Sequence, residues 1–228
     1  MEYAISDYAL IIISTIIALA AQMYIKHNYK KYSKQENSTG NSGYEAARKI
    51  LDNNGLNHVG INMVNGELTD YYNPTNKTVN LSTNIYEGRT IAAVSVAAHE
   101  CGHAIQDEQG YTFLKIRRKI IPLVNFASYA GYFAVVIGLL ASAMQLIKIG
   151  ILMELIILFF QLVTLPVEFN ASSRGLKQIK ELGLLENKEN NGARKMLTSA
   201  ALTYVASVAS AVIQVLRLVL ILNRRRRD

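Results

Sequence analysis

The chain has 228 residues, 50% of them hydrophobic, a formal net charge of +7 and a single cysteine. This length suits one or two compact units, and one cysteine excludes an intrachain disulfide. The positive charge gathers at the ends of apolar stretches and not in a motif of basic and aromatic residues. This distribution excludes a nucleic-acid-binding protein of the usual kind and favours contact with anionic lipid head groups.

Four apolar stretches are long enough to cross a bilayer, for which a helix of about 20 residues suffices. They are Tyr8–Ile25, Ile120–Ile147, Ile149–Val167 and Met196–Leu222. The first is followed by basic residues, whereas a cleaved signal peptide begins with them. The sequence therefore predicts a membrane protein with about four transmembrane helices, the first of them an uncleaved anchor.

Basic residues near the apolar stretches predict which side each connecting segment occupies, because cytoplasmic loops are rich in lysine and arginine. Segments 26–119 and 168–195 carry most of these residues and are expected in the cytoplasm, whereas only Lys148 marks the short outer loop. Four simple crossings leave the terminal cluster Arg224–Arg227 outside, against the rule.

Segment 26–119 begins with a polar linker and then shows signals for regular structure. Ser42 or Gly43 is expected to cap a helix over Tyr44–Asn53. Two strand-like stretches, Glu67–Tyr72 and Thr78–Ser82, flank a turn-prone Asn-Pro-Thr-Asn sequence and predict a β-hairpin. This hairpin is either the edge along which a peptide substrate adds as a strand or a small structural ribbon.

A second helix is expected from Ile91 to about Gln106, with Thr90 as its N-cap, and it carries an HExxH motif at 99–103. Because residues four apart share one helix face, His99 and His103 can bind one Zn²⁺, while Glu100 can act as a base on water activated by the metal. The alternative is a pair of core histidines without a metal.

Catalytic zinc sites use three protein ligands, so a further ligand is needed. The extended form HExxHxxGxxH is excluded, because Gln106 and Gln109 stand where glycine and histidine would be required. Asp107 and Glu108 lie only one turn beyond the motif on the same helix. Glu168 follows the third apolar stretch. By then the chain has crossed the membrane twice and is expected on the same side as the HExxH helix. From the residues alone, Glu168 is either the third ligand or an interfacial glutamate.

A resemblance to a known family is carried by four segments: NSGYEAARKILDNNGL, LTDYYNPTNKTVNLS, AVSVAAHECGHAIQ and TLPVEFNASSRGLKQI. They resemble the neutral zinc metallopeptidases of bacterial membranes, the YugP-like family, over nearly the whole chain. The last segment is also similar to the EFxAD element of HtpX-type membrane proteases. The resemblance implies the zinc ligands His99, His103 and Glu168 and the base Glu100.

One position departs from the HtpX-type pattern. Ser172 stands where that pattern has aspartate, so the acidic partner that commonly orients a ligand histidine is absent. Asn170, Ser172 or another residue must take its place. The donor that would stabilise an oxyanion also stays open among Tyr111, Tyr204 and Arg174.

The expected fold is a mainly α-helical membrane protein with about four transmembrane helices and a gluzincin-like zinc-protease domain that carries a small β-hairpin or sheet. The expected segments are a membrane anchor at 1–25, a cytoplasmic catalytic segment at 26–119, two membrane helices at 120–167, a cytoplasmic loop with the third ligand at 168–195, and a membrane helix with a basic tail at 196–228.

The expected function is that of a membrane-embedded endopeptidase with Zn²⁺ as cofactor. Its partners would be membrane lipids and a peptide or membrane-protein substrate near the cytoplasmic face. No nucleic-acid partner is expected, and the sequence does not indicate an oligomeric state. A zinc-stabilised scaffold or chaperone is one alternative, although it would not need Glu100. A transporter is another, because Glu154 and Arg217 interrupt apolar stretches.

Overall fold

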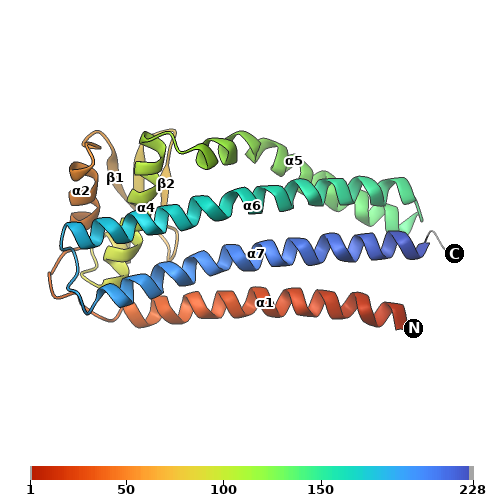
Figure 1. Cartoon of the computed structure of the whole chain (residues 1–228), viewed down its shortest axis with the longest axis horizontal. Helices are drawn as coiled ribbons and strands as arrows, with labels where there is room; N and C mark the ends of the chain where they lie inside the picture. Colours follow the sequence, from red (N-terminus) through yellow and green to blue (C-terminus); the bar gives the residue numbers. More distant parts are fainter. Residues whose placement is uncertain (1, 226–228) are drawn as a thin grey trace. The chain divides into compact units, whose positions relative to one another are not determined.

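The fold is described from a computed structural model, in which residues 2–225 are placed, with side chains from Tyr8 to Arg224. The elements in chain order are α1 (Glu2–Tyr32), α2 (Gly43–Asn53), β1 (Gly60–Val64), β2 (Tyr71–Asn73), β3 (Thr78–Ser82), α3 (Thr83–Tyr86), α4 (Ile91–Glu108), α5 (Thr112–Leu140), α6 (Met144–Glu181) and α7 (Asn190–Arg225) (Figure 1).

The chain forms two compact units, each built from separate stretches of sequence. Unit 1 comprises Met1–Gln22, Lys115–Leu165 and Thr203–Asp228, and unit 2 comprises Met23–Leu114 and Pro166–Leu202. Helices α1, α5, α6 and α7 therefore contribute residues to both units. The motif at 99–103 and Glu168 belong to unit 2.

The described part of the chain contains four helices that are long and apolar enough to cross a membrane, as the sequence predicted. These candidate spans are Tyr8–Tyr32, Thr112–Leu140, Met144–Glu181 and Asn190–Arg224. Of the terminal basic cluster, Arg226 and Arg227 lie outside the described residues.

The connection between α5 and α6 differs from the prediction. It is a tight turn at residues 141–143, with Ser142 in the left-handed region at φ 52°. Lys148, expected in an outer loop, lies inside α6. Lysine is a good helix former, so its charge marks no helix end here. In unit 1 the two helices approach closely, because a Cβ added to Gly150 would lie 2.3 Å from Val135 Cγ2.

The predicted hairpin is present in unit 2, within a three-stranded sheet of order β1-β3-β2. Strand β2 pairs antiparallel with β3, with Tyr72 opposite Val79, and it is shorter than the predicted Glu67–Tyr72. Strand β1 pairs parallel with β3 and was not predicted. The order leaves β2 at one edge of the sheet.

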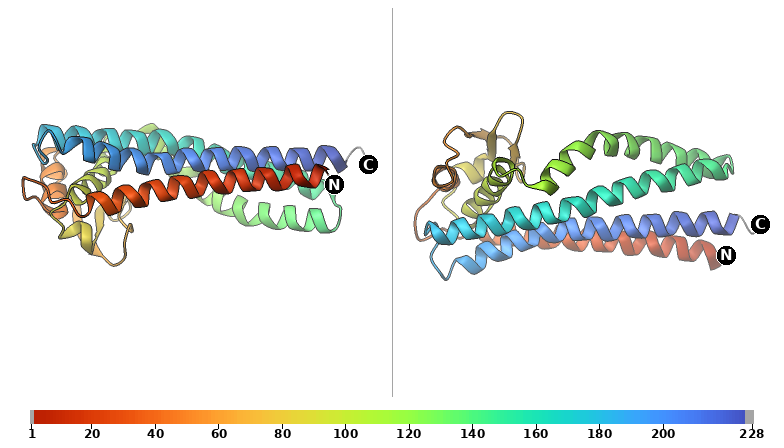
Figure 2. Two further views of the ribbon diagram at one scale, coloured as in Figure 1. Left: turned by 90° about the horizontal axis from the view of Figure 1, so that it is seen from below. Right: turned by 45° about the horizontal axis from the view of Figure 1, so that its top comes forward.

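Helix α4 lies at the centre of unit 2, where it contacts α2, α3, β2 and β3 (Figure 2). Most of its side chains are buried, which its many alanines permit because small residues allow close helix packing. Helix α2 begins as predicted, with the Ser42 side chain and Glu45 forming a reciprocal capping box. Its buried side chains Ala46, Ala47, Ile50 and Leu51 belong to the same core as α4.

Segment 168–195 was expected to be a loop, and this expectation is wrong for its first half. Helix α6 continues without interruption from the apolar stretch to Glu181. No proline and no left-handed glycine interrupts the helix after Glu168, and the first left-handed glycine, Gly183 at φ 58°, comes only after the helix has ended. Glu168 therefore projects from the middle of a helix, which holds its position more rigidly than a loop would.

Candidate metal centre

Helix α4 presents both motif histidines on one face. The Thr90 side chain accepts a hydrogen bond from the backbone N–H of Ala93 at 3.2 Å, so the helix begins where the sequence predicted. Nine residues further on, His99 and His103 lie one turn apart with ring centroids 4.8 Å from each other. Their spacing is the one that a shared metal ion requires.

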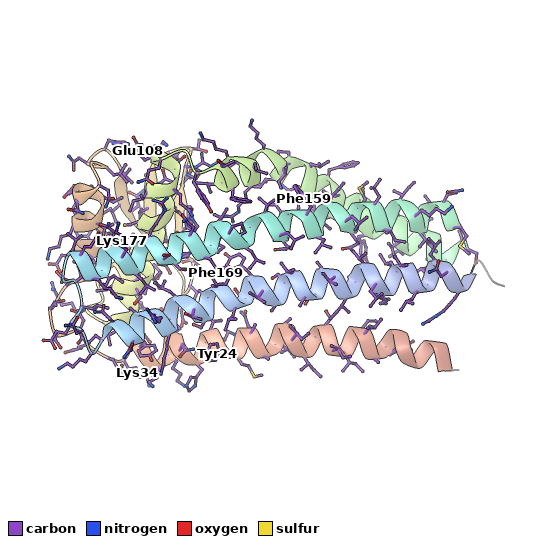
Figure 3. The ribbon with its side chains drawn as sticks, in the orientation of Figure 1. Tyr24, Lys34, Glu108, Phe159, Phe169 and Lys177 are labelled. Carbon is purple, nitrogen blue, oxygen red and sulfur yellow. The ribbon has the colours of Figure 1, made fainter. Side chains whose placement is uncertain are left out.

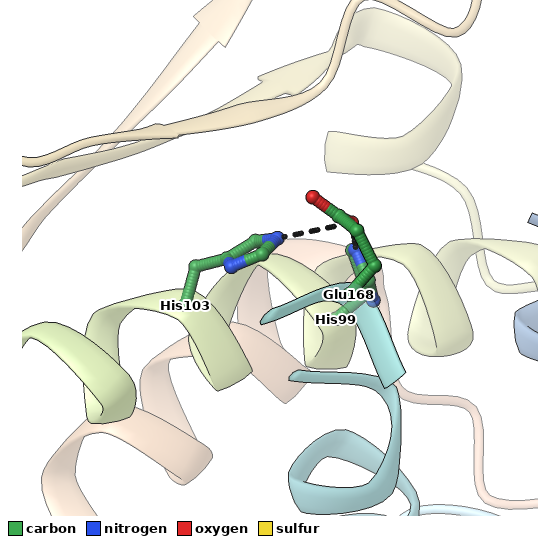
Figure 4. A group of neighbouring side chains, drawn as sticks. All are labelled: His99, His103 and Glu168. Carbon is green, nitrogen blue, oxygen red and sulfur yellow. Dashed lines mark ion pairs between the residues drawn. The ribbon is translucent and has the colours of Figure 1, made fainter. Parts of the chain in front are cut away.

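Glu168 of α6 completes a group of three that could hold a metal ion (Figure 4). Its Oε2 lies 3.3 Å from His99 Nε2 and 3.6 Å from His103 Nε2. Ligand atoms at the corners of a tetrahedral zinc site, with bonds of about 2.0–2.2 Å, are about 3.3–3.6 Å apart. The donor types and their separations therefore fit Zn²⁺.

His103 is oriented by Gln106, one turn further along α4. The amide oxygen of Gln106 lies 3.0 Å from His103 Nδ1, while its amide nitrogen donates to the Val167 carbonyl and to Asn170 Oδ1. With the amide group turned this way, its oxygen faces the ring and accepts a hydrogen bond from the Nδ1–H tautomer of His103. In that tautomer Nε2 carries no hydrogen and can bind a metal.

His99 has a different neighbour, Ser172 of α6, whose Oγ lies 3.1 Å from His99 Nδ1. A serine hydroxyl can accept a hydrogen bond from an imidazole N–H in the same geometry as an aspartate oxygen, but it carries no charge. Neutral oxygens of Ser172 and Gln106 thus face the two histidine rings, in place of the acidic partner that the sequence pattern lacks.

Helices α4 and α6 cross at very short range beside this group. A Cβ added to Gly102 would lie 2.4 Å from the Ala171 carbonyl oxygen, and one added to Gly175 would lie 2.8 Å from the Ala98 carbonyl oxygen. Only glycine at these two positions allows the backbones to come so close. The crossing brings Glu168 and Ser172 within reach of the histidines.

We expect Gly102→Ala to push the two helices apart. Overpacking of this kind lowers the free energy of unfolding by about 1–3 kcal/mol, and zinc affinity should fall with it because Glu168 moves away. Thermal denaturation and zinc titration of the detergent-purified protein measure both effects. Gly60→Ala is the control, since its added Cβ would meet only the Thr78 side chain, at 3.3 Å. Equal changes in both variants would contradict the crossing argument.

Glu100 lies beside the group but is not a member of it. Its side chain is buried, and burial raises its pKa to about 7, an effect that the neighbouring His99 opposes and the Glu168 carboxylate reinforces. The backbone N–H of Tyr72 in β2 hydrogen-bonds to the Glu100 carboxylate and lowers the pKa. A carboxylate with a pKa near neutrality is well matched to accepting and returning a proton.

Edge strand β2 is tied to α4 by side chains as well. The Tyr72 hydroxyl donates to Asp107 Oδ2 at 2.8 Å, and Lys77 forms an ion pair with the same oxygen at 2.6 Å. Asp107 therefore positions the hairpin against helix α4. Cys101 is fully buried, its thiol facing the Ala47 carbonyl, and burial raises the pKa of that thiol, so it remains a protonated packing residue.

Comparison with known proteins agrees with this geometry. The sequence profile described as "Putative neutral zinc metallopeptidase" matches residues 7–223. The chain belongs to this family. It is also 48% identical to the "Putative membrane protease YugP" of Bacillus subtilis (strain 168) over 221 residues, which is 95% of this chain and 98% of that protein. No solved structure matches the chain.

For this zinc metallopeptidase family member, the structure brings together the three residues proposed as ligands, with Glu100 beside them. Sequence reasoning missed Gln106 and the Tyr72 amide. Gln106 carries a usable signal, because it lies three residues after His103 on the same helix face. Of the suggested oxyanion donors, Arg174 is engaged with Asn170 and Gln109, and Tyr111 lies 3.4 Å from the Pro166 carbonyl oxygen.

We expect Gln106→Ala to weaken zinc binding by about 10–100-fold, the usual effect of removing the partner that orients a ligand histidine. Competition with a chromophoric chelator measures the affinity. Gln109→Ala is the matched control, because Gln109 caps the C-terminal end of the same helix and its side chain accepts a hydrogen bond from Arg174. Wild-type affinity in the Gln106 variant would show that the ring needs no such support.

Proposed function

We propose that this protein is a zinc-dependent peptidase that hydrolyses peptide bonds with His99, His103 and Glu168 as metal ligands and Glu100 as general base. The observation that carries the proposal is the approach of Glu168 Oε2 to both histidine Nε2 atoms, at 3.3 and 3.6 Å, beside the buried Glu100. Two histidines and one glutamate form a donor set of catalytic zinc sites.

Zinc, when bound, supplies a Lewis acid that polarises the substrate carbonyl and lowers the pKa of water. The protein's own residues do the rest. Glu100 takes a proton from the attacking water and passes it to the leaving amine. Gln106 and Ser172 hold the two imidazoles with Nε2 toward the metal. A bound divalent cation also favours the charged form of Glu100 over the neutral one.

Strand β2 suggests where the substrate binds. It is one of the two edge strands of the sheet, and its Tyr72 amide reaches the Glu100 carboxylate. A peptide that adds as a strand beside β2, through backbone hydrogen bonds, would place its backbone next to the proposed base. This supports the first of the two interpretations of the hairpin, the substrate edge.

The membrane setting of the proposed peptidase rests on the four candidate spans and on the relative, whose name describes a membrane protease. The excess of lysine and arginine in segments 26–119 and 168–195 supports an active site on the cytoplasmic face. Substrates would then be membrane proteins or peptides presented at that face.

The test is peptide hydrolysis by the purified full chain, with zinc content measured on the same sample. We expect about one zinc per chain, casein cleavage or self-cleavage that stops when the metal is chelated, and recovery when zinc is returned. Stoichiometric zinc without cleavage of any substrate would support the zinc-stabilised scaffold. Absence of bound zinc would refute the proposal.

The transporter alternative gains little from the two charges within the spans. Arg217 donates to Gln214 at 3.2 Å, and among the described residues no ion pair joins it to Glu154. Glu154 lines a cavity of about 540 Å³ in unit 1, whose other lining residues are both polar and apolar. Flux of a solute through proteoliposomes that is independent of zinc would favour this alternative.

A further inference from the structure

A groove in unit 2 lies between the second half of α6 and the start of α7. Its volume is about 520 Å³, and the residues that line it share two helix faces. On α6, Ser173, Lys177 and Lys180 follow one another at spacings of four and three, and on α7 Arg194, Thr198 and Ala201 do the same. Residues with these spacings lie on one face of a helix.

The groove has a basic rim and a buried, largely apolar floor. Lys177, Lys180 and Arg194 are exposed at the rim, and no acidic side chain lines the groove among the described residues. Lys177 has one neighbour of opposite charge, Glu181 at 3.7 Å, but both side chains are largely exposed. Exposed pairs of this kind contribute little, so Lys177 remains available to another anion.

Polarity changes along the groove. Ser173 and Thr198 offer hydroxyl groups beside the basic rim, whereas Phe169, Leu197 and Ala201 form an apolar end toward the hydrophobic part of each helix. Leu197 and Ala201 are buried, and Phe169 remains 47% exposed. Figure 3 labels Phe169 and Lys177 on α6, with Phe169 nearer the apolar stretch of that helix.

We propose that this groove binds the head group of an anionic phospholipid. The phosphate would lie among Lys177, Lys180 and Arg194 and accept hydrogen bonds from Ser173 and Thr198, while the first part of an acyl chain would cover Phe169. Basic pockets between membrane helices at the cytoplasmic side are suited to such head groups. A soluble phosphate would satisfy the rim but would leave the apolar end uncovered, which favours a lipid.

The groove is separate from the place where a peptide would react. Its floor includes Ser172, which touches His99 at Nδ1, the ring nitrogen opposite the one that faces Glu168. An occupant of the groove therefore lies behind the metal ligand. The proposal concerns binding alone and does not depend on peptidase activity or on bound zinc.

The test is native mass spectrometry of the full chain in detergent, titrated with phosphatidylglycerol or with phosphatidylcholine. We expect phosphatidylglycerol to bind preferentially and the triple variant Lys177→Gln, Lys180→Gln, Arg194→Gln to bind it about 100-fold more weakly, since each basic residue near a membrane anion accounts for roughly fivefold. The matched control is Lys26→Gln, Lys30→Gln, Lys34→Gln, which removes the same charge from exposed positions of α1 and the residues just after it.

Retained affinity in the control, together with loss in the groove variant, would support the site. An equal loss in both variants would overturn it in favour of general attraction to a basic surface. Displacement of the lipid by millimolar glycerol phosphate or inorganic phosphate would overturn the choice of a lipid. Should the triple variant fail to fold, as judged by circular dichroism, Lys180→Gln alone should weaken binding about fivefold, and an unchanged affinity would refute the proposal.

Discussion

Glu100→Gln should retain about one zinc per chain and lose nearly all hydrolysis. Glu100 is not among the three residues that could hold the metal, so its neutralisation leaves the ligands in place. The amide cannot accept a proton, and removal of a general base lowers kcat by about 10²–10⁴-fold. Zinc content by elemental analysis and kcat on a labelled peptide are the two measurements.

Glu108→Gln is the control for this variant. It removes the same charge from the exposed end of the same helix α4 (Figure 3) and should leave kcat unchanged. Turnover by the zinc-loaded Glu100 variant at the wild-type rate would show that the proton acceptor has been assigned wrongly. Loss of zinc from that variant would instead indicate that Glu100 supports the metal.

Glu168→Ala should abolish stable zinc binding and activity together. It leaves two histidines on one helix and removes the only proposed ligand from α6, and a catalytic zinc needs three. Since loss of an orienting partner alone weakens a metal site by about 10–100-fold, loss of a ligand should exceed that range. The measurement is retention of zinc after dialysis against a weak chelator.

Two variants sharpen this prediction. Glu168→Gln keeps the size of the buried side chain and tests whether the effect comes from the donor and not from a cavity. Glu181→Ala removes a carboxylate from the exposed end of the same helix, where it contacts Lys177 and Gln178, and should bind zinc as the wild type does. If all three variants retained zinc, a residue other than Glu168 would complete the site.

The parts of the fold that follow from local chemistry were predictable. Helices α2 and α4 have cap residues and a clear apolar side, and the candidate spans are visible in composition alone. Strand β1 was missed, because its burial does not alternate and its pairing partner β3 lies 18 residues further on. The turn between α5 and α6 was misplaced, because it forms among apolar residues that carry no charge signal.

The candidate site likewise has residues that local sequence predicts and residues that only the tertiary structure reveals. His99, Glu100 and His103 are recognisable because their chemistry depends on spacing within one helix. Glu168 required knowledge of which segments return to the metal, and the residues alone left it undecided until the family resemblance was added. The Tyr72 amide carries no side-chain signature, so a backbone donor of this kind becomes visible only when the sheet is placed against α4.

The crossing of α4 and α6 has a consequence for any attempt to excise a water-soluble enzyme from this chain. A fragment that stops before α5 would contain the whole HExxH motif, yet it would lack Glu168, Ser172 and the backbone that covers Gly102. Such a fragment would expose the small-residue face of α4 and hold at most a two-histidine site. The proposed hydrolytic site therefore requires helix α6, because the same continuous helix that contains the apolar stretch also supplies Glu168.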